Sequence, residues 1–123
     1  MPTPRFHQRA REDVEELWLF IAQEDIAAAD RYLDELEERA HTYAMHPDIG
    51  QIEPDIAERL ERAMGLEFPV DITIRSFLHR NHRCYYIPDD EGIYILRVID
   101  MRREQDRATR NVTYCDWRQC DRI

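Results

Sequence analysis

The chain has 123 residues, of which 43% are hydrophobic and 35% charged, a composition that suits one globular domain and excludes a disordered chain. No apolar run approaches the ~20 residues that a membrane span needs, and the N-terminal segment lacks the hydrophobic stretch of a signal peptide. We therefore expect a cytoplasmic protein without membrane contact. The net charge of −9 argues against direct nucleic-acid binding, which depends on neutralising phosphates.

The charge is unevenly distributed along the sequence. Residues 1–74 hold eighteen acidic side chains and seven arginines, whereas residues 75–123 hold eight acidic side chains and ten arginines. Every one of the seventeen basic residues is arginine, for which codon bias in a GC-rich genome is the simplest explanation. No lysine is present to act as a catalytic base or a point-charge ligand for phosphate, which leaves only the planar fork of arginine.

In chain order, residues 4–9 indicate a short first strand, which their proline restricts to a sheet edge. A helical period follows, breaks at residues 23–25, and resumes with Asp25 as the expected N-cap. The segment HPDIG at 46–50 ends the second run, because a residue before proline disfavours helix. Two amphipathic runs joined so closely predict an antiparallel helical hairpin. The apolar stripe of the first run comprises Val14, Leu17, Trp18 and Ile21.

Strand patterns dominate the second half. A short amphipathic stretch opens at Pro54 and stops at Gly65. Alternation then predicts strands at 70–77 and 83–87, and the nearly continuous apolar run at 93–99 is typical of a central strand. The expected fold class is α+β, with the helical hairpin followed by an antiparallel meander.

Arg97 is the most unusual position, because an arginine among four aliphatic neighbours is costly to bury without a partner. One interpretation pairs it with a carboxylate inside the fold or points it to an open sheet face. The other makes it, with Arg75 on a neighbouring strand, a site for a carboxylate or phosphate, which guanidinium groups bind bidentately. Tyr85 and Tyr86 are adjacent in a strand, so one is expected in the core and one exposed.

Several other residues have bland interpretations. The stripe of Leu17, Trp18 and Ile21 fits ordinary core, although Trp18 also suits a partner groove. The basic run that begins at Arg102 and Arg103 is interrupted by acids and fits a solvated segment.

Cysteines and histidines give no metal signature. Cys84 fits a small buried residue in a strand, whereas Cys115 and Cys120 lack CxxC spacing, and their role stays open. His79 and His82 have HxxH spacing without further ligands, which favours hairpin histidines over a metal site. We expect no metal and no cofactor.

Six segments, taken together in their order and spacing, resemble the RelE/ParE superfamily of type II toxin–antitoxin systems, nearer to its ParE branch. They are AREDVEELWLFIA at 10–22, the alanine-rich start of the second helix, HPDIG at 46–50, IRSF at 74–77, HRCYY at 82–86 and GIYILRVI at 92–99. The resemblance implies a helical hairpin packed on a small twisted antiparallel sheet. It makes residues 1–107 a RelE/ParE-like toxin domain and leaves residues 108–123 as a C-terminal extension of unknown role.

The resemblance implies a function as well. ParE-type toxins poison DNA gyrase, RelE-type toxins cleave messenger RNA on the ribosome, and an antitoxin segment that folds over the toxin inhibits both. The lysines of the RelE active site have no counterpart here, and Ala108 stands about where a late tyrosine belongs. The ribonuclease alternative would therefore depend on Arg75, His82, Arg97 and Arg102.

The leading hypothesis is a non-enzymatic ParE-like toxin, neutralised by a cognate antitoxin and inhibiting gyrase, present as a homodimer or as a heterotetramer with the antitoxin. A third possibility is a non-toxic binding module, favoured by the acidic charge and by Asp100–Met101 where the family has a His-Gly-type turn. An amphipathic antitoxin segment is expected on the hairpin surface and the open sheet. The residues expected to bind target or antitoxin are Leu17, Trp18, Ile21, Arg75, Phe77, Tyr86, Arg97, Arg102 and Arg103.

Overall fold

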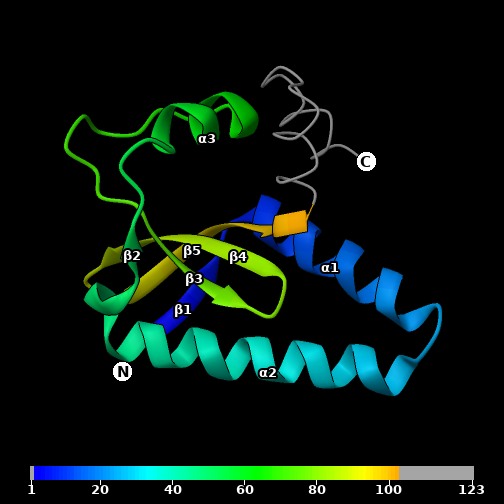
Figure 1. The fold of residues 1–123 in the computed structure, drawn as a ribbon. Coiled ribbons are helices and arrows are strands. Elements are labelled where there is room, and N and C mark those ends of the chain that lie inside the picture. Colours follow the sequence, from blue (N-terminus) through cyan, green and yellow to red (C-terminus); the bar gives the residue numbers. More distant parts are fainter. Residues whose placement is uncertain (1, 103–123) are drawn as a thin grey trace.

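A computed structural model describes residues 2–102 of the chain. It confirms the α+β class, with a sheet that lies between α2 on one side and α3 on the other (Figure 1). The elements in chain order are β1 (Thr3–Phe6), α1 (Gln8–Ala22), α2 (Ile26–Met45), the short 3-10 helix η1 (Pro47–Ile49), β2 (Gln51–Ile52), α3 (Ala57–Met64), β3 (Arg75–His79), β4 (His82–Asp89) and β5 (Gly92–Asp100).

The strands form one sheet in the order β1-β5-β4-β3-β2. The meander of β3, β4 and β5 is antiparallel, as predicted. β1 instead runs parallel to β5, so the complete sheet is mixed. Parallel neighbours need a long crossover connection, and here the chain passes from β1 directly into α1 and returns to the sheet only later. The edge position predicted for residues 4–9 is confirmed, although the strand ends at Phe6 because α1 begins at Gln8.

The helical hairpin packs against one face of the sheet. Asp25 caps α2 as predicted, since its side chain accepts a hydrogen bond from the backbone N–H of Ala28 at 3.0 Å. Small residues of α2 let the helix approach the strands closely, and the hairpin buries one large apolar cluster. That cluster contains Ala10, Tyr32, Leu36, Ala40, Ala44, Phe77, Cys84, Tyr86, Ile93, Ile95 and Val98.

The opposite face of the sheet is covered by α3. Leu60 of α3 is fully buried, and Gly65 ends the helix in the left-handed conformation, as the sequence predicted. Tyr85 and Tyr86 are exposed by only 3% and 0%. The expectation of one exposed tyrosine is therefore wrong, because a second apolar cluster occupies the face that was expected to be open. This second cluster contains Ile56, Leu60, Ile74, Tyr85, Leu96 and Ile99.

β3 is shorter at its start than the strand predicted at 70–77. The backbone N–H of Ile72 bonds the carbonyl of Pro69 at 3.1 Å, so the chain is still turning there. Val70 is fully exposed, whereas Ile74 is buried against α3. The alternation at 70–74 was misleading because Ile72 and Ile74 pack in the cluster beneath α3 and Val70 is exposed, with no sheet ladder at these positions.

Gly92 sets the position of β1. Its φ of 130° lies in a region that favours glycine, and a Cβ there would stand 2.4 Å from the carbonyl oxygen of Thr3. Glycine therefore lets β1 pair with β5, and this pairing places His7 and the start of α1 beside the sheet.

Candidate functional site

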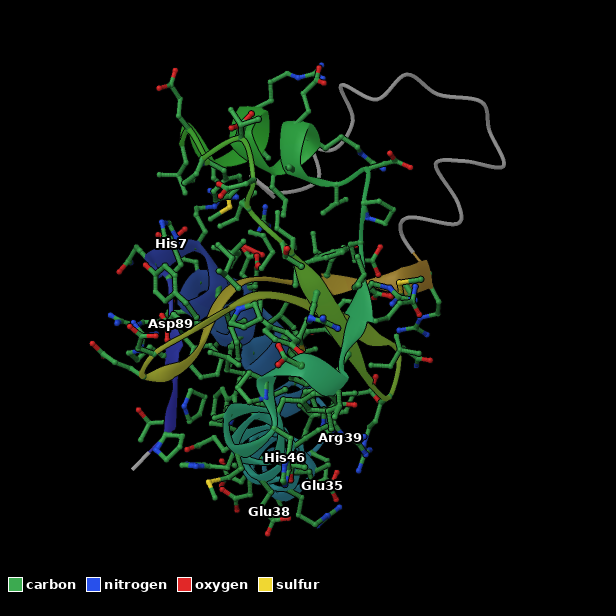
Figure 2. The ribbon with its side chains drawn as sticks, turned by 90° about the vertical axis from the view of Figure 1, so that its left-hand side faces the viewer. His7, Glu35, Glu38, Arg39, His46 and Asp89 are labelled. Atoms are coloured by element: carbon green, nitrogen blue, oxygen red, sulfur yellow. The ribbon has the colours of Figure 1, made fainter. Side chains whose placement is uncertain are left out.

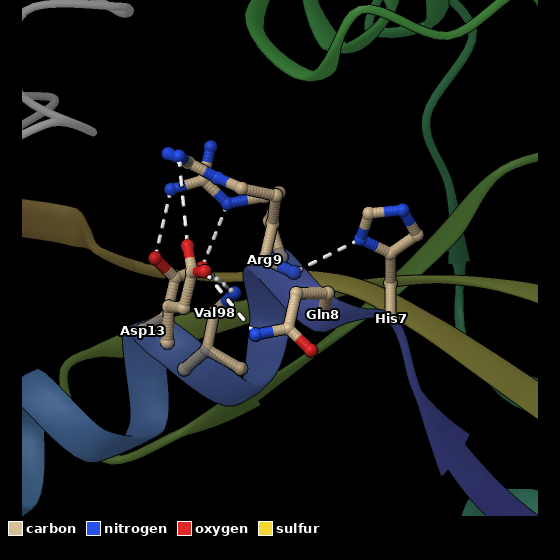
Figure 3. Close-up of polar contacts among 7 residues, drawn as sticks. His7, Gln8, Arg9, Asp13 and Val98 are labelled. Atoms are coloured by element: carbon tan, nitrogen blue, oxygen red, sulfur yellow. Dashed lines mark hydrogen bonds and ion pairs between the residues drawn. The ribbon is translucent and has the colours of Figure 1, made fainter.

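Arg97 pairs with a carboxylate of α1. Its Nε and Nη2 donate to the two oxygens of Asp13 at 2.7 and 2.8 Å, and the guanidinium is almost completely buried. Asp13 also accepts the backbone N–H of Val98 at 2.9 Å (Figure 3). The interpretation of Arg97 as a partner of a carboxylate inside the fold matches this geometry. The ion pair fastens α1 to the part of β5 that extends past the end of β1.

A β-bulge turns Arg97 toward this position. β4 pairs Tyr85 with Arg97 but Tyr86 with Ile95, so Leu96 is an extra residue on β5. Without the bulge Arg97 would share the face of Ile95, which packs in the first cluster. With it, Arg97 comes into register with Tyr85 of the second cluster.

The start of α1 carries a histidine cap. Nδ1 of His7 accepts the backbone N–H of Arg9 at 2.9 Å (Figure 3). Burial lowers the pKa of His7, and the charges of Arg9 and Arg97 lower it further. Only a ring with an unprotonated Nδ1 can accept this bond, so the cap belongs to the neutral histidine.

Arg75 holds the loop that follows α2. Its Nη1 donates to the carbonyls of Asp48 and Gly50, both at 2.8 Å. The hydroxyl of Tyr86 donates to the carbonyl of Pro47 at 2.7 Å and accepts from the N–H of Gly50 at 3.1 Å. Arg75 and Tyr86, which face each other across β3 and β4, thus clamp the HPDIG segment to the sheet.

The two arginines of the predicted anion site do not meet. Arg75 is in register with Tyr86 of the first cluster, and Arg97 is in register with Tyr85 of the second. Directly opposed strand residues share a face, so the two guanidinium groups lie on opposite faces of the sheet. Both are engaged by groups of the protein itself.

The residues of the ribonuclease alternative are also dispersed. His82 is buried, with Nδ1 2.8 Å from the hydroxyl of Tyr32. It lies in the row of His79, four residues and about 13 Å along β3 from Arg75. Arg102 stands at the end of β5 beside Asp100, at 3.5 Å. These groups do not converge on one point in the part of the chain that the structure describes.

The remaining predicted contact residues differ in accessibility. Phe77 and Tyr86 are buried, and Phe77 stacks on Tyr43 with centroids 4.3 Å apart. Leu17 and Ile21 are partly buried against the first cluster. Trp18 is half-buried and donates from Nε1 to Asp30 at 2.9 Å, which joins α1 to α2. Arg103 lies outside the described residues, as do Cys115, Cys120 and the 108–123 extension.

Sequence patterns did not reveal an exposed apolar group at the tip of the helical hairpin. Leu19 and Phe20 on α1 are 54% and 67% exposed, and Ile26 at the start of α2 is 62% exposed. Large apolar side chains that the fold leaves in water often mark an interaction surface. The sequence feature that could have predicted them is the continuous apolar run Leu17–Ile21, because five consecutive residues cannot all lie on the buried face of one helix.

A buried polar group was missed as well. The hydroxyl of Ser76 donates to Glu53 at 2.6 Å and accepts from Nη1 of Arg83 at 2.9 Å. The group ties the segment after β2 to the meander. Within residues 2–102 we find neither a cluster of three or more metal-ligating side chains nor a helix both long and apolar enough to cross a membrane.

Comparison with known families identifies the class. The sequence model described as ParE toxin of type II toxin-antitoxin system, parDE, matches residues 5–105, which is most of the chain. The chain therefore belongs to the ParE toxin family. The resemblance drawn from its motifs is confirmed at that level. No curated protein matches the sequence.

Proposed function

We propose that this chain is a toxin that acts by binding, is neutralised by a cognate antitoxin and inhibits DNA gyrase. The observation that carries the proposal is the ParE family match over residues 5–105. The ion pair between Arg97 and Asp13 supports the proposal. The arginine of β5 is buried in that pair and stabilises the fold, so it is not available to bind RNA. An inhibitor of this kind needs a complementary surface and no proton-transfer groups.

The geometry favours this function over messenger RNA cleavage. General acid–base catalysis requires titrating groups within hydrogen-bond reach of one reacting centre. Arg75 and Arg97 lie on opposite faces, and His82 is turned inward to Tyr32. This arrangement argues against the ribonuclease alternative.

An in-cell experiment separates the two functions. We predict that induction of the toxin relaxes plasmid DNA and stops growth, and that co-expression of the antitoxin reverses both effects. Mapping messenger RNA 5′ ends in the same cultures tests the alternative. New cleavage sites with unchanged plasmid supercoiling would reject gyrase inhibition in favour of ribonuclease activity.

We propose the hairpin tip as the antitoxin contact. Leu19, Phe20 and Ile26 give an exposed apolar surface, and the half-buried Trp18 belongs to the same end of α1. Such a surface suits the apolar side of an amphipathic partner helix. The sheet face expected to receive the antitoxin is occupied at its centre by α3, which supports a contact on the helices.

Phe20→Glu tests this surface. We expect the substitution to weaken antitoxin binding about tenfold or more, because a carboxylate replaces a ring that the partner would desolvate, with little change in Tm. Met45→Glu is the matched control, since Met45 is 50% exposed but lies at the other end of α2, about 30 Å away along the helix. Calorimetric titration gives both affinities. Equal losses of antitoxin affinity in the two variants would contradict the hairpin tip as the contact.

A further inference from the structure

The β3–β4 turn is attached to α2 by three buried rings. His79 and His82 face each other across the turn formed by Arg80 and Asn81, and they are 3% and 9% exposed. Tyr32 of α2, 6% exposed, meets both edge-on, with ring centroids 4.6 Å from His79 and 5.6 Å from His82. These ring contacts and the ion pair between Arg80 and Glu35 attach the turn to α2.

His82 can hold a proton without losing its partner. Its Nδ1 lies 2.8 Å from the hydroxyl of Tyr32, which also stands 3.4 Å from the backbone carbonyl of His79. When Nδ1 of His82 carries no proton, Tyr32 donates to it. When Nδ1 carries a proton, the bond reverses and Tyr32 donates to the carbonyl. Asp100, which pairs with His82 across β4 and β5, supplies a nearby negative charge.

Among the described residues, His79 has no side-chain partner that could accept a hydrogen bond from its ring in this way. Neither of its ring nitrogens makes a hydrogen bond of ordinary geometry in the part of the chain that the structure describes, and the backbone of Tyr32 lies near enough to raise its pKa. A proton would create a buried cation with no well-formed hydrogen bond to stabilise it. Burial lowers the pKa of His79 and the charge of Arg39 lowers it further, and together these outweigh the opposing effect of the Tyr32 backbone. The titratable and charged groups that surround His79 are Tyr32, Glu35 and Arg39 of α2, Arg80 of the turn, His82 of β4 and, beyond it, Asp100 of β5.

The only carboxylate of α2 in this group is already engaged. Glu35 forms an ion pair with Arg80, whose guanidinium also lies 5.6 Å from the centre of the Tyr32 ring. Glu35 and Arg39 both lie on α2 in Figure 2. A proton on His79 would therefore add a third positive charge beside Arg39 and Arg80, with Glu35 shared among them.

We propose that His79, Tyr32 and His82 form an acid-sensitive lock, which holds the β3–β4 turn on α2 at neutral pH and releases it when His79 gains a proton. The lock goes beyond the proposed inhibition of gyrase and does not depend on it. Because the pKa of His79 is lowered in the folded state, the unfolded state binds the proton more readily. The stabilisation is present above the ordinary value of 6.5 and is lost as the pH falls through the folded-state pKa.

The test compares the whole chain with its His79→Phe variant, in which the ring keeps the edge-on contact but cannot titrate. Between pH about 7.5 and about 5, the Tm of the wild type should fall by about 4–8 °C more than that of the variant. His41→Gln is the control, because His41 is exposed on α2, and it should follow the wild type. Identical pH dependence in the wild type and His79→Phe would overturn the proposal.

A second measurement needs no variant and decides the matter if His79→Phe does not fold. A proton NMR titration of the wild type should show that the ring of His79 titrates below its ordinary value of 6.5. The amide protons of His79 and His82, which pair across the turn, should lose protection against hydrogen exchange over the same pH range, before those of β5. A ring that titrates at or above 6.5, or protection that stays constant, would contradict the lock.

Discussion

At the scale of single residues, Asp13 joins α1 to β5 through its side chain. It neutralises a buried guanidinium and also accepts a backbone N–H of β5. We predict that Asp13→Ala lowers the free energy of unfolding by about 3–5 kcal/mol, because it leaves Arg97 buried and without its counter-charge. Urea denaturation measures this loss.

Two controls distinguish this from a general effect of charge. Glu12→Ala removes a neighbouring carboxylate that pairs with Arg9 at 3.7 Å on the surface, and it should cost at most about 1 kcal/mol. Asp13→Leu combined with Arg97→Met should recover the part of the loss that comes from the unpaired guanidinium, since apolar residues can replace a buried ion pair, but not the hydrogen bond to Val98. A cost for Asp13→Ala no larger than that of Glu12→Ala would refute a structural role for the pair.

His7 gives a pH-dependent helix cap. Its pKa is lowered in the folded protein, first by burial and then by Arg9 and Arg97. Its contribution is therefore present above 6.5 and disappears as the pH falls through the folded-state pKa. We predict that acidification removes about 0.5–2 kcal/mol of stability through this cap. His7→Asn, which caps without titrating, should lose less between pH about 7.5 and about 5.5 in urea denaturation. Parallel losses would contradict the prediction.

The sequence indicated that Arg97 needs a partner but could not identify it. The burial cost of an arginine in an apolar strand follows from local residues, whereas Asp13 lies 84 positions away. The bulge at Leu96 also leaves no local signal, although it decides which face Arg97 occupies. His7 escaped prediction because N-caps are usually Ser, Thr, Asp or Asn.

At the scale of elements, the loop between α2 and β2 depends on close packing at Gly50. A Cβ at this position would lie 2.2 Å from the hydroxyl oxygen of Tyr86 and 2.9 Å from the carbonyl oxygen of Ser76. We predict that Gly50→Ala lowers the free energy of unfolding by about 1–3 kcal/mol through this overlap. The backbone adds no strain, because the φ of −69° is open to alanine. Thermal unfolding measures the effect.

A double-mutant cycle with Tyr86→Phe tests the cause. Removal of the hydroxyl takes away the nearest atom, so Gly50→Ala should cost less in the Tyr86→Phe background than in the wild type. Gly65→Ala provides a contrast, since its Cβ would meet nothing within 4 Å and only its φ of 69° is unfavourable. That cost should be unchanged by Tyr86→Phe. Additive effects for Gly50 and Tyr86 would disprove the clash.

Element types were predictable where one period ran long enough. The helical hairpin and the three meander strands follow directly from their patterns. Asp25 starts α2 because its side chain caps the helix, and Gly65 ends α3 because glycine adopts the left-handed conformation. The strand predicted at 70–74 was wrong because Ile72 and Ile74 pack in the cluster beneath α3 without pairing in the sheet, and Val70 is exposed. The parallel pairing of β1 was hidden, because its partner β5 lies at the far end of the described chain.

At the scale of the whole molecule, the acidic helical hairpin and the more basic meander are separate parts of the fold, as they are separate parts of the sequence. Figure 2 shows Glu35, Glu38 and Arg39 together on α2, with His46 just after its end, well apart from His7 and Asp89. An acidic hairpin with an exposed apolar tip suits a partner that is both apolar and basic. This surface was only partly predictable, because exposure depends on which side of α1 the fold leaves uncovered.

Supercoiling by purified gyrase tests the central claim most directly. Relaxed plasmid and gyrase are titrated with the whole chain, alone and after mixing with the antitoxin. We predict that supercoiling decreases as the toxin concentration rises and that the antitoxin restores it. Full supercoiling at every concentration of a folded toxin that still binds its antitoxin would contradict the account.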